Sequence, residues 1–425
     1  MVFSHRQTGL LDAPEEIPML PDLFSTCGPQ EKRVFCALQK FGPVSKSQLL
    51  ALTGLKLTTL SRFLRPLEEL RLVVRPQFGE SSGGRKPALY DVTDRDYYLL
   101  GVDISRTYMQ IVLTDLKLRV RASRRFHMDG QSTPERTVRT IVETARELAD
   151  QATTPGGRIV LAGVGAVGPM SRTDGVLLSP RYFQASGWKD VPLVSMLRQG
   201  LGCPVSLDNG ANTAVLAEAL YGIGRGVPRV VYVNCGVGIR TGTFLDGVLI
   251  RTSQNAEDVF GHMVVNADGR LCTCGKRGCL DCYATIRAVT SEFAECRARG
   301  EHSDLPADVT WESICAAARQ GDALAASVLR HAATYLGIGL SNLINLLGPG
   351  LVILSGPLIR QSDLFYETAA GVAQKQVWAV QSGVKFHRGG SLEEDAIAVG
   401  GAALALEEAA EALPDSRVQA VQHSG

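Results

Sequence analysis

Three cysteines crowd into eight residues near the middle of the chain, and no other feature restricts the local fold as strongly. The segment 272–279 reads CTCGKRGC, and His262 lies ten residues before its first cysteine. Thiolates and imidazole are the ligands of a tetrahedral zinc site, and the two glycines let the backbone turn between them. Buried free cysteines are the alternative, but core packing alone does not require this spacing. We therefore predict a zinc knuckle whose fourth ligand is either His262 or Cys282.

The spacing H-x9-C-x-C-G-x-x-G-C-x-(E/D) resembles the zinc signature of the ROK family, which groups sugar kinases with sugar-responsive transcriptional repressors. On this resemblance the metal ligands are His262, Cys272, Cys274 and Cys279. The resemblance also implies an α/β body with two lobes of the actin/hexokinase-like (ribonuclease H-like) fold for residues 97–410. The knuckle would be a structural Zn²⁺ site within that body.

Length and composition bound the remaining possibilities. A chain of 425 residues is too long for one ordinary domain, and 45% apolar with 20% charged residues is typical of a soluble globular protein. The net charge of +1 gives no global argument for nucleic acid. Residues 332–359 carry no charge, yet the Gly348-Pro349-Gly350 break favours a buried helix and a strand over a membrane span. We expect a cytoplasmic protein without a membrane partner.

The first quarter of the chain predicts a DNA-binding unit. Residues 1–29 read as a flexible extension, and residues 30–95 as helices at 31–41, 45–54 and 58–70 followed by two strands around a Ser-Gly-Gly tip. This order is that of a winged helix-turn-helix. Residues 31–90 contain 11 Lys and Arg against 4 Asp and Glu, a local basic surface. A small helical protein-interaction module is the alternative.

The third predicted helix would enter the major groove of operator DNA. The side chains expected to read bases lie near its start: Lys56, Thr58, Thr59, Ser61 and Arg62. Arg65 would contact phosphate. The wing sequence GGRKP, with Arg85 and Lys86, resembles the GGR-x-P wing of ROK repressors and could reach a minor groove. Pro66 lies inside the third helix, where we expect a kink or an early break.

The rest of the chain repeats one unit of strands and helix. Strands from residue 97 lead to an amphipathic helix at 133–151, and a second round begins at residue 229. We expect a first lobe over residues 96–208, completed by a C-terminal helix at about 395–412. The second lobe, with the knuckle, would span residues 209–394, and residues 413–425 would form a tail.

Sequence changes at the family's kinase motifs argue against phosphoryl transfer. Kinases of the family use a D-x-G-G-T phosphate turn, and residues 103–107 read DISRT here. A second phosphate turn, residues 236–242, carries Arg240 in place of a glycine. Gly210 occupies the position of the catalytic aspartate, with Asp208 two residues away. We expect no kinase activity; a residual sugar kinase fused to a DNA-binding unit is the alternative.

The family's sugar-binding positions are partly kept. Asn209 and His262 match, Asp281 is a shorter carboxylate, and Gly210 and Val259 replace acidic residues. These positions predict either an effector that differs from a standard hexose, such as a sugar derivative, or a vestigial cavity. With the predicted winged helix-turn-helix, the ROK resemblance implies a DNA-binding transcriptional regulator, a repressor of carbohydrate-metabolism genes. We expect it to act on double-stranded operator DNA as a homodimer or a dimer of dimers.

Overall fold

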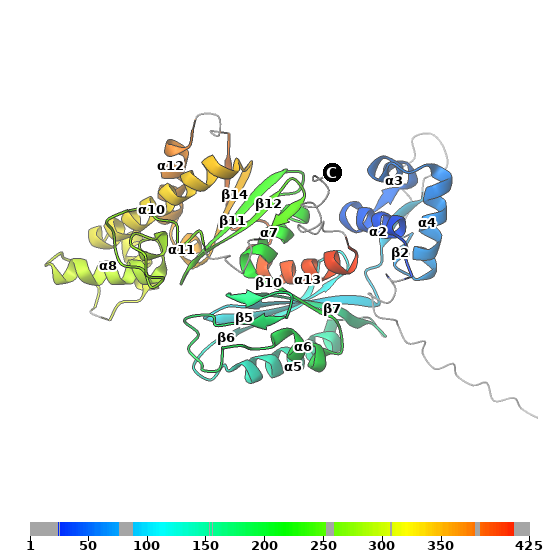
Figure 1. Cartoon of the computed structure of the whole chain (residues 1–425), viewed down its shortest axis with the longest axis horizontal. Coiled ribbons are helices and arrows are strands. Elements are labelled where there is room, and N and C mark those ends of the chain that lie inside the picture. Colours follow the sequence, from blue (N-terminus) through cyan, green and yellow to red (C-terminus); the bar gives the residue numbers. More distant parts are fainter. Residues whose placement is uncertain are drawn as a thin grey trace, which may run out of the picture.

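The computed structural model describes Phe24 and residues 26–75, 88–152, 154, 156–251, 259–306, 308–378 and 383–411. Figure 1 shows a small N-terminal unit beside a body built on two sheets, with helices between the sheets and on their outer faces. The chain therefore combines a small helical unit with a larger α/β body, as the sequence predicts.

The N-terminal unit consists of three helices and a small sheet. The helices are α2 (Pro29–Phe41), α3 (Lys46–Thr53) and α4 (Leu57–Glu69). The sheet has the order β1-β3-β2, from β1 (Val44–Ser45), β3 (Leu89–Val92) and β2 (Val73–Val74), and both pairings are antiparallel. The Ser45 side chain accepts a hydrogen bond from the Gln48 amide and starts α3, which ends at Gly54 in the left-handed conformation.

Helix α4 runs through Pro66 and ends at Glu69, so the early break, one of the two outcomes expected at this proline, does not occur. Pro66 lies in the last turn, where its missing amide removes a single hydrogen bond to the preceding turn. Leu60, Leu64 and Leu67 are buried along one face of the helix. Their burial holds the helix against the core on both sides of the proline.

Two further expectations fall at the edges of this unit. Phe24 and Cys27 are buried, and the ring of Phe24 packs edge-on against Phe35 at 5.0 Å. Phe24 and Cys27, which belong to the segment predicted as an extension, are therefore part of the core of this unit. The base of the predicted hairpin is present as β2 paired with β3. Its tip, including Arg85 and Lys86, lies outside the described residues.

The body contains two five-stranded sheets of the same design. The first has the order β10-β7-β4-β5-β6 and the second β13-β12-β11-β14-β15. In each, three consecutive strands pair antiparallel and two later strands add in parallel. The first sheet comprises β4 (Tyr97–Ile104), β5 (Tyr108–Asp115), β6 (Val120–His127), β7 (Arg158–Ala166) and β10 (Val205–Asn209). The second comprises β11 (Arg229–Cys235), β12 (Ile239–Leu245), β13 (Val248–Ile250), β14 (Leu351–Ser355) and β15 (Lys385–Arg388). The predicted duplication is confirmed.

Two helices lie between the sheets, α7 (Gly210–Leu220) and α13 (Ala396–Ala409) (Figure 1). A Cβ on Gly163 of β7 would lie 1.8 Å from the carbonyl oxygen of Gly401 in α13. The backbones of helix and strand therefore touch, and only glycine allows this approach. This contact sets the spacing of the central layer.

The remaining elements cover the outer faces or shape the loops. Helices α5 (Pro134–Ala152) and α6 (Leu193–Leu201) pack on the first sheet. The helices packed with the second sheet are α8 (Ile286–Ala298), α9 (Trp311–Gln320), α10 (Ala323–Leu347), α11 (Pro357–Gln361) and α12 (Asp363–Gln376). The short elements are β8 (Met170–Ser171), β9 (Val176–Leu177), η2 (Leu280–Cys282) and η4 (Glu393–Asp395).

Helix α10 is, within the described residues, the one helix long and apolar enough to cross a membrane. Most of its apolar stretch is buried inside the protein, where it packs against α8, α9 and α12. It ends at Gly348 in the left-handed conformation and leads into β14. The predicted buried helix and following strand are confirmed.

One apolar core joins the N-terminal unit to the body. It includes Phe35 and Leu38 of α2 together with Leu406 and Ala410 at the end of α13. In addition, the Gln39 side chain donates a hydrogen bond to the Leu116 carbonyl of the body at 2.9 Å. The helical unit is therefore packed directly on the body.

Candidate functional site

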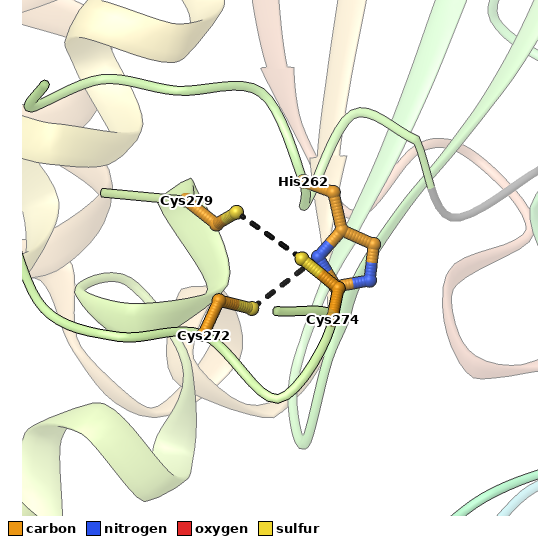
Figure 2. Close-up of side chains that lie close together, drawn as sticks. All are labelled: His262, Cys272, Cys274 and Cys279. Atoms are coloured by element: carbon orange, nitrogen blue, oxygen red, sulfur yellow. Dashed lines mark hydrogen bonds between the residues drawn. The ribbon is translucent and has the colours of Figure 1, made fainter. Parts of the chain in front are cut away.

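The knuckle loop brings four metal-ligating side chains together. The ligand atoms of His262, Cys272, Cys274 and Cys279 all lie within 4.8 Å of one another (Figure 2). An antiparallel β-bridge between Val264 and Cys279 holds the loop, and backbone hydrogen bonds close the turn at Cys272. The four residues proposed from the family resemblance therefore meet at one point.

Glycine is required at one position of this loop. Gly278 has a φ of +73°, and a Cβ there would lie 1.6 Å from the Asn266 carbonyl oxygen. Gly275 also has a positive φ, +90°. A side chain at either position would strain the turn that carries Cys279 and Cys274. The glycines that suggested a knuckle in the sequence thus have a direct geometric role.

The spacing of the ligand atoms fits a tetrahedral metal. The Cys274 and Cys279 sulfurs are 3.6 Å apart, and His262 Nδ1 is 3.6 Å from the Cys272 sulfur (Figure 2). Ligands bound about 2.3 Å from a tetrahedral zinc lie about 3.8 Å from each other. Four protein ligands fill a tetrahedral coordination sphere. The centre can therefore hold a structural metal ion, and it leaves no open coordination position for catalysis.

The electrostatics of the cluster also favour a cation. Burial, with the nearby thiols of Cys274 and Cys272, raises the pKa of the Cys279 thiol to about 12. The sulfurs therefore resist ionising together when no positive charge lies between them. A divalent cation offsets this cost, because it binds the thiolate form.

The alternative ligand Cys282 lies outside the four-residue group. Burial and the neighbouring Cys272 thiol raise the pKa of Cys282 to about 12. Within the four-residue group, His262 supplies the fourth ligand atom.

A cavity of about 340 Å³ adjoins the knuckle and is lined by loops from both halves of the body. His262, Thr273 and Cys274 form its wall on the knuckle side, and Gly168 and Arg181 belong to the opposite wall. Arg181 Nη1 donates to the Thr273 carbonyl at 3.3 Å, and both residues line the cavity. The metal centre and the cavity therefore share a wall.

The three predicted effector residues lie at this cavity in different ways. His262 and Asp281 line it, and one Asp281 oxygen accepts the Ile239 amide at 3.1 Å. Asn209 is fully buried behind Gly168 and caps α7 by accepting the Ala211 amide. Its Nδ2 has no hydrogen-bond partner among the described residues. Sequence reasoning missed Arg181, because no local pattern shows which loop faces the knuckle.

The two turns that resemble altered phosphate turns of the family's kinases each place an arginine at a cavity wall. Arg106 is buried, and its Nε donates to the Arg181 carbonyl at 2.8 Å. Its Nη1 lies 3.4 Å from where a Cβ on Gly238 would be. Arg106 and Arg240 line both the first cavity and an adjacent cavity of about 710 Å³. Both altered phosphate turns thus face the same space.

Asp208 is engaged away from these two cavities. Its carboxylate is fully buried and lies 2.7 Å from Arg251 Nε and 3.6 Å from Arg172 Nη1. The Asn209 amide and Asn212 Nδ2 donate to its other oxygen at 2.7 and 2.9 Å. Both oxygens of the Asp208 carboxylate are therefore engaged by these four groups.

The predicted DNA-reading residues lie on one surface of the N-terminal unit. Lys56, Thr58, Ser61, Arg62 and Arg65 are exposed, and Thr59 is partly exposed. Lys46 of α3 donates to Ser61 at 3.1 Å, and Arg65 forms an exposed ion pair with Glu69 at 2.8 Å. The start of α4 therefore presents polar and basic side chains to solvent.

Comparisons with known proteins agree with this arrangement. The ROK family profile matches residues 99–408. The xylose repressor of Bacillus spizizenii is 24% identical over 348 residues, covering 82% of this chain and 87% of that protein. The glucokinase of Thermotoga maritima is 30% identical over 278 residues, covering 63% of this chain and 84% of that enzyme.

The crystal structure of a ROK family transcriptional regulator, a homologue of the Escherichia coli Mlc protein, matches in fold with a TM-score of 0.76 at 24% identity. The match covers 97% of that chain and 91% of this chain. The share of this chain is larger than residues 99–425 alone could supply. The match therefore extends into the N-terminal unit. With the family profile spanning most of the chain, this protein belongs to the ROK family.

Proposed function

We propose that this ROK protein is a sequence-specific DNA-binding regulator, a repressor of carbohydrate-metabolism genes that responds to a sugar or a sugar derivative. The observation that carries the proposal is the exposed polar start of α4 in a helical unit packed on the body. Relatives named as xylose repressors match most of this chain, which supports the same role.

The N-terminal unit acts as a winged helix-turn-helix over residues 30–95. The order α2, α3, α4 and a β2–β3 hairpin is that of such a unit. Helix α4 enters the major groove with Lys56, Thr58, Thr59, Ser61 and Arg62, and Arg65 contacts phosphate. The wing residues Arg85 and Lys86 add contacts beside the groove.

The body senses the effector and forms the dimer. Residues 96–208 with the helix at 395–412 form one lobe, residues 209–394 form the other, and residues 413–425 are a tail. An effector between the lobes changes operator affinity if it binds one arrangement of the lobes better than the other. Two-fold pairing of chains presents two α4 helices to a palindromic operator.

Zn²⁺ bound by His262, Cys272, Cys274 and Cys279 would fix the knuckle that forms one wall of the effector cavity. The ligand spacing and the glycine turns support this assignment. A closed site of this kind stabilises a loop and performs no chemistry. The same residue, His262, thus connects the metal to the ligand site.

A residual sugar kinase is the second candidate, favoured by the 30% identity to glucokinase. Phosphoryl transfer needs backbone amides around the phosphates and a carboxylate base. Arg106 and Arg240 fill the phosphate turns, and Gly210 replaces the base. We therefore expect no turnover of ATP with a panel of sugars, which a coupled assay measures.

The deciding experiment is a gel shift on DNA from upstream of the protein's own gene, beside a scrambled fragment of equal length. We expect binding of the native fragment that weakens steeply with salt. Arg62→Ala should lose the preference for the native fragment, and Arg124→Ala, an exposed arginine of β6, should keep it. Equal binding of both fragments by the full-length protein would reject the proposal.

A further inference from the structure

A loop of the first half of the body reaches across to the metal knuckle of the second half. Arg181 and Tyr182 lie in the connection between β9 and α6, beside the first sheet. Arg181 Nη1 donates to the Thr273 carbonyl at 3.3 Å, and the Tyr182 hydroxyl donates to Thr273 Oγ1 at 3.4 Å. Backbone and side chain of one knuckle residue are therefore both bound by a single loop of the other half.

The Tyr182 ring is also contacted from both halves of the body. The guanidinium carbon of Arg287, in α8, lies 4.3 Å from the ring centre. From the first half, the guanidinium of Arg106 lies 5.8 Å from the same ring centre, and its Nε donates to the Arg181 carbonyl at 2.8 Å. A cation near an aromatic face is attracted to it. The ring thus adds a second contact between the halves beside the one at Thr273.

The base of this loop is fixed in the first half. Phe183 stacks on Trp188 with ring centres 4.4 Å apart, and Trp188 is buried in the core of that half. The Trp188 indole nitrogen donates to the Ser132 carbonyl at 3.0 Å. Arg181 and Tyr182 therefore extend towards the knuckle from a firmly placed neighbour.

The contact itself is one that can open without unfolding either half. Tyr182 has a φ of +69°, which a bulky side chain rarely adopts and which persists only where surrounding contacts hold it. Arg181, Tyr182 and Arg287 are exposed, so water competes for each of their hydrogen bonds and cation–ring contacts. Loss of these contacts would release the strain at Tyr182, which favours an open arrangement of the loop.

Thr273 depends on the knuckle for its position. It lies between Cys272 and Cys274 in the sequence, and within the described residues it makes no backbone-to-backbone hydrogen bond of its own. A metal ion held by the four ligands would fix the sulfur atoms of both its neighbours. The position of the acceptor for Arg181 and Tyr182 is therefore set by whether the knuckle holds a metal.

Tyr182 and Thr273 lie at the junction of two cavities. Both residues line the 340 Å³ cavity, and both also line a cavity of about 230 Å³ beside α8. Their contact therefore belongs to the boundary of the space assigned to the effector.

We propose that Arg181 and Tyr182 form a latch between the two halves of the body, and that metal binding at the knuckle closes this latch by fixing Thr273. The closed latch holds the wall of the smaller cavity in place, and loss of the metal releases it. The inference rests on the proposed function, because the metal site and the effector cavity are parts of that proposal.

The first test is the zinc affinity of the full-length protein, measured by competition with a chromophoric chelator. Coupling is reciprocal, so opening the latch must weaken zinc binding although neither latch residue is a ligand. The double variant Arg181→Ala with Tyr182→Ala should bind Zn²⁺ about fivefold more weakly. Tyr182→Phe keeps the ring and loses one exposed hydrogen bond, so its loss should be about twofold. Gln184→Ala, an exposed position of the same loop, should bind Zn²⁺ like the wild type.

The second test is tryptic cleavage of the wild type after Arg181, quantified by mass spectrometry with and without bound zinc. Cleavage needs an open loop, and its rate follows the population of that open form. Removal of zinc should raise the rate at this bond about fivefold, in line with the loss of affinity. Cleavage after Arg198, an exposed arginine of α6 in the same half, should not change.

Equal zinc affinity in the wild type and the double variant would overturn the inference. So would equal acceleration of cleavage after Arg181 and Arg198, or cleavage after Arg181 that does not depend on zinc. Operator binding is measured separately. A protein that shows the coupling but binds no operator keeps the latch and refutes the regulator, whereas one that binds operator without the coupling refutes this inference alone.

Discussion

The ammonium group of Lys40 in α2 lies 2.9 Å from the carboxylate of Glu407 in α13. The Glu407 side chain is 3% exposed, and the Tyr221 hydroxyl also donates to it. Ile397, at the start of the same helix, lines the larger interlobe cavity. Helix α13 therefore runs from the cavity to the helical unit.

Lys40→Met should destabilise the protein by about 2 kcal/mol or more, because it leaves a buried carboxylate without its cation. Lys32→Met is the matched control: Lys32 is on the same helix, and its partner Glu411 is 75% exposed. An exposed ion pair contributes at most about 1 kcal/mol. Urea unfolding measures both changes. Equal losses of unfolding free energy in Lys40→Met and Lys32→Met would show that burial of Glu407 does not strengthen its ion pair.

Cys274→Ala should release zinc and abolish the effector response, because three ligands hold the metal far less tightly than four. His262→Ala should do the same. Cys282→Ala should keep the metal, since Cys282 lies outside the four-residue group. Native mass spectrometry measures zinc per chain. Cys203→Ala is the control, because Cys203 is a buried cysteine outside the cluster. If Cys282→Ala loses zinc and His262→Ala keeps it, then Cys282 and not His262 is the fourth ligand.

Asp103 should make stability depend on pH in a direction opposite to that of an ordinary salt-bridged carboxylate. Burial raises the pKa of Asp103 to about 6, with partial relief from Tyr108 and Arg240. The folded protein thus holds this proton more tightly than the unfolded chain, so ionisation destabilises the fold as pH rises from about 4 to 6. The penalty is fully present above pH 6.

Asp103→Asn should therefore be more stable than the wild type at pH 7.5, by up to about 3 kcal/mol, and the difference should vanish towards pH 4. Asp129→Asn is the control whose effect should have the opposite sign, because the Gln131 amide lowers the pKa of Asp129. Chemical denaturation of Asp103→Asn and Asp129→Asn at pH 4 and pH 7.5 measures the change in unfolding free energy. A pH-independent effect of Asp103→Asn would exclude a raised pKa.

The sequence predicts those features whose cause is local. The Ser45 cap and Gly54 stop define α3, and the repeated strand pattern defines both sheets. The knuckle was visible because its ligands lie within eighteen residues of one another. The contact between Lys40 and Glu407 was not, because it joins residues 367 positions apart. Such contacts follow from how whole elements pack, which no local pattern records.

Pro66 shows the opposite limit, where local propensity is overruled by packing. The residue predicts a kink or an early break, but burial of apolar side chains on both sides of it continues α4 without a break to Glu69. The position of Arg181 in the cavity wall is also set by tertiary packing, because its loop meets residues of the other half of the body there. Tertiary contacts decided both outcomes.

Gly163→Ala should prevent stable folding or cost more than about 3 kcal/mol, because the added Cβ would lie 1.8 Å from a backbone oxygen of α13. Neither backbone can move without separating the strand from the helix. Gly371→Ala in α12 is the matched control, since a Cβ there meets nothing within 4 Å. It should stabilise the helix by up to about 1 kcal/mol. Thermal unfolding that ranks the two variants in the reverse order would contradict the close contact.

Glu69→Gln should tighten DNA binding, because Glu69 pairs with the Arg65 guanidinium that we assign to a phosphate. An exposed pair of this kind is worth up to about 1 kcal/mol, so the gain is at most about fivefold. Arg65→Ala should weaken binding of native and scrambled DNA alike and lower the salt slope by about one. Thr59→Ala should instead reduce the preference for the native sequence, because base contacts alone carry that information. Fluorescence anisotropy over a salt series separates the two effects. A change in sequence preference for Arg65→Ala would move that residue from the phosphate backbone to a base edge.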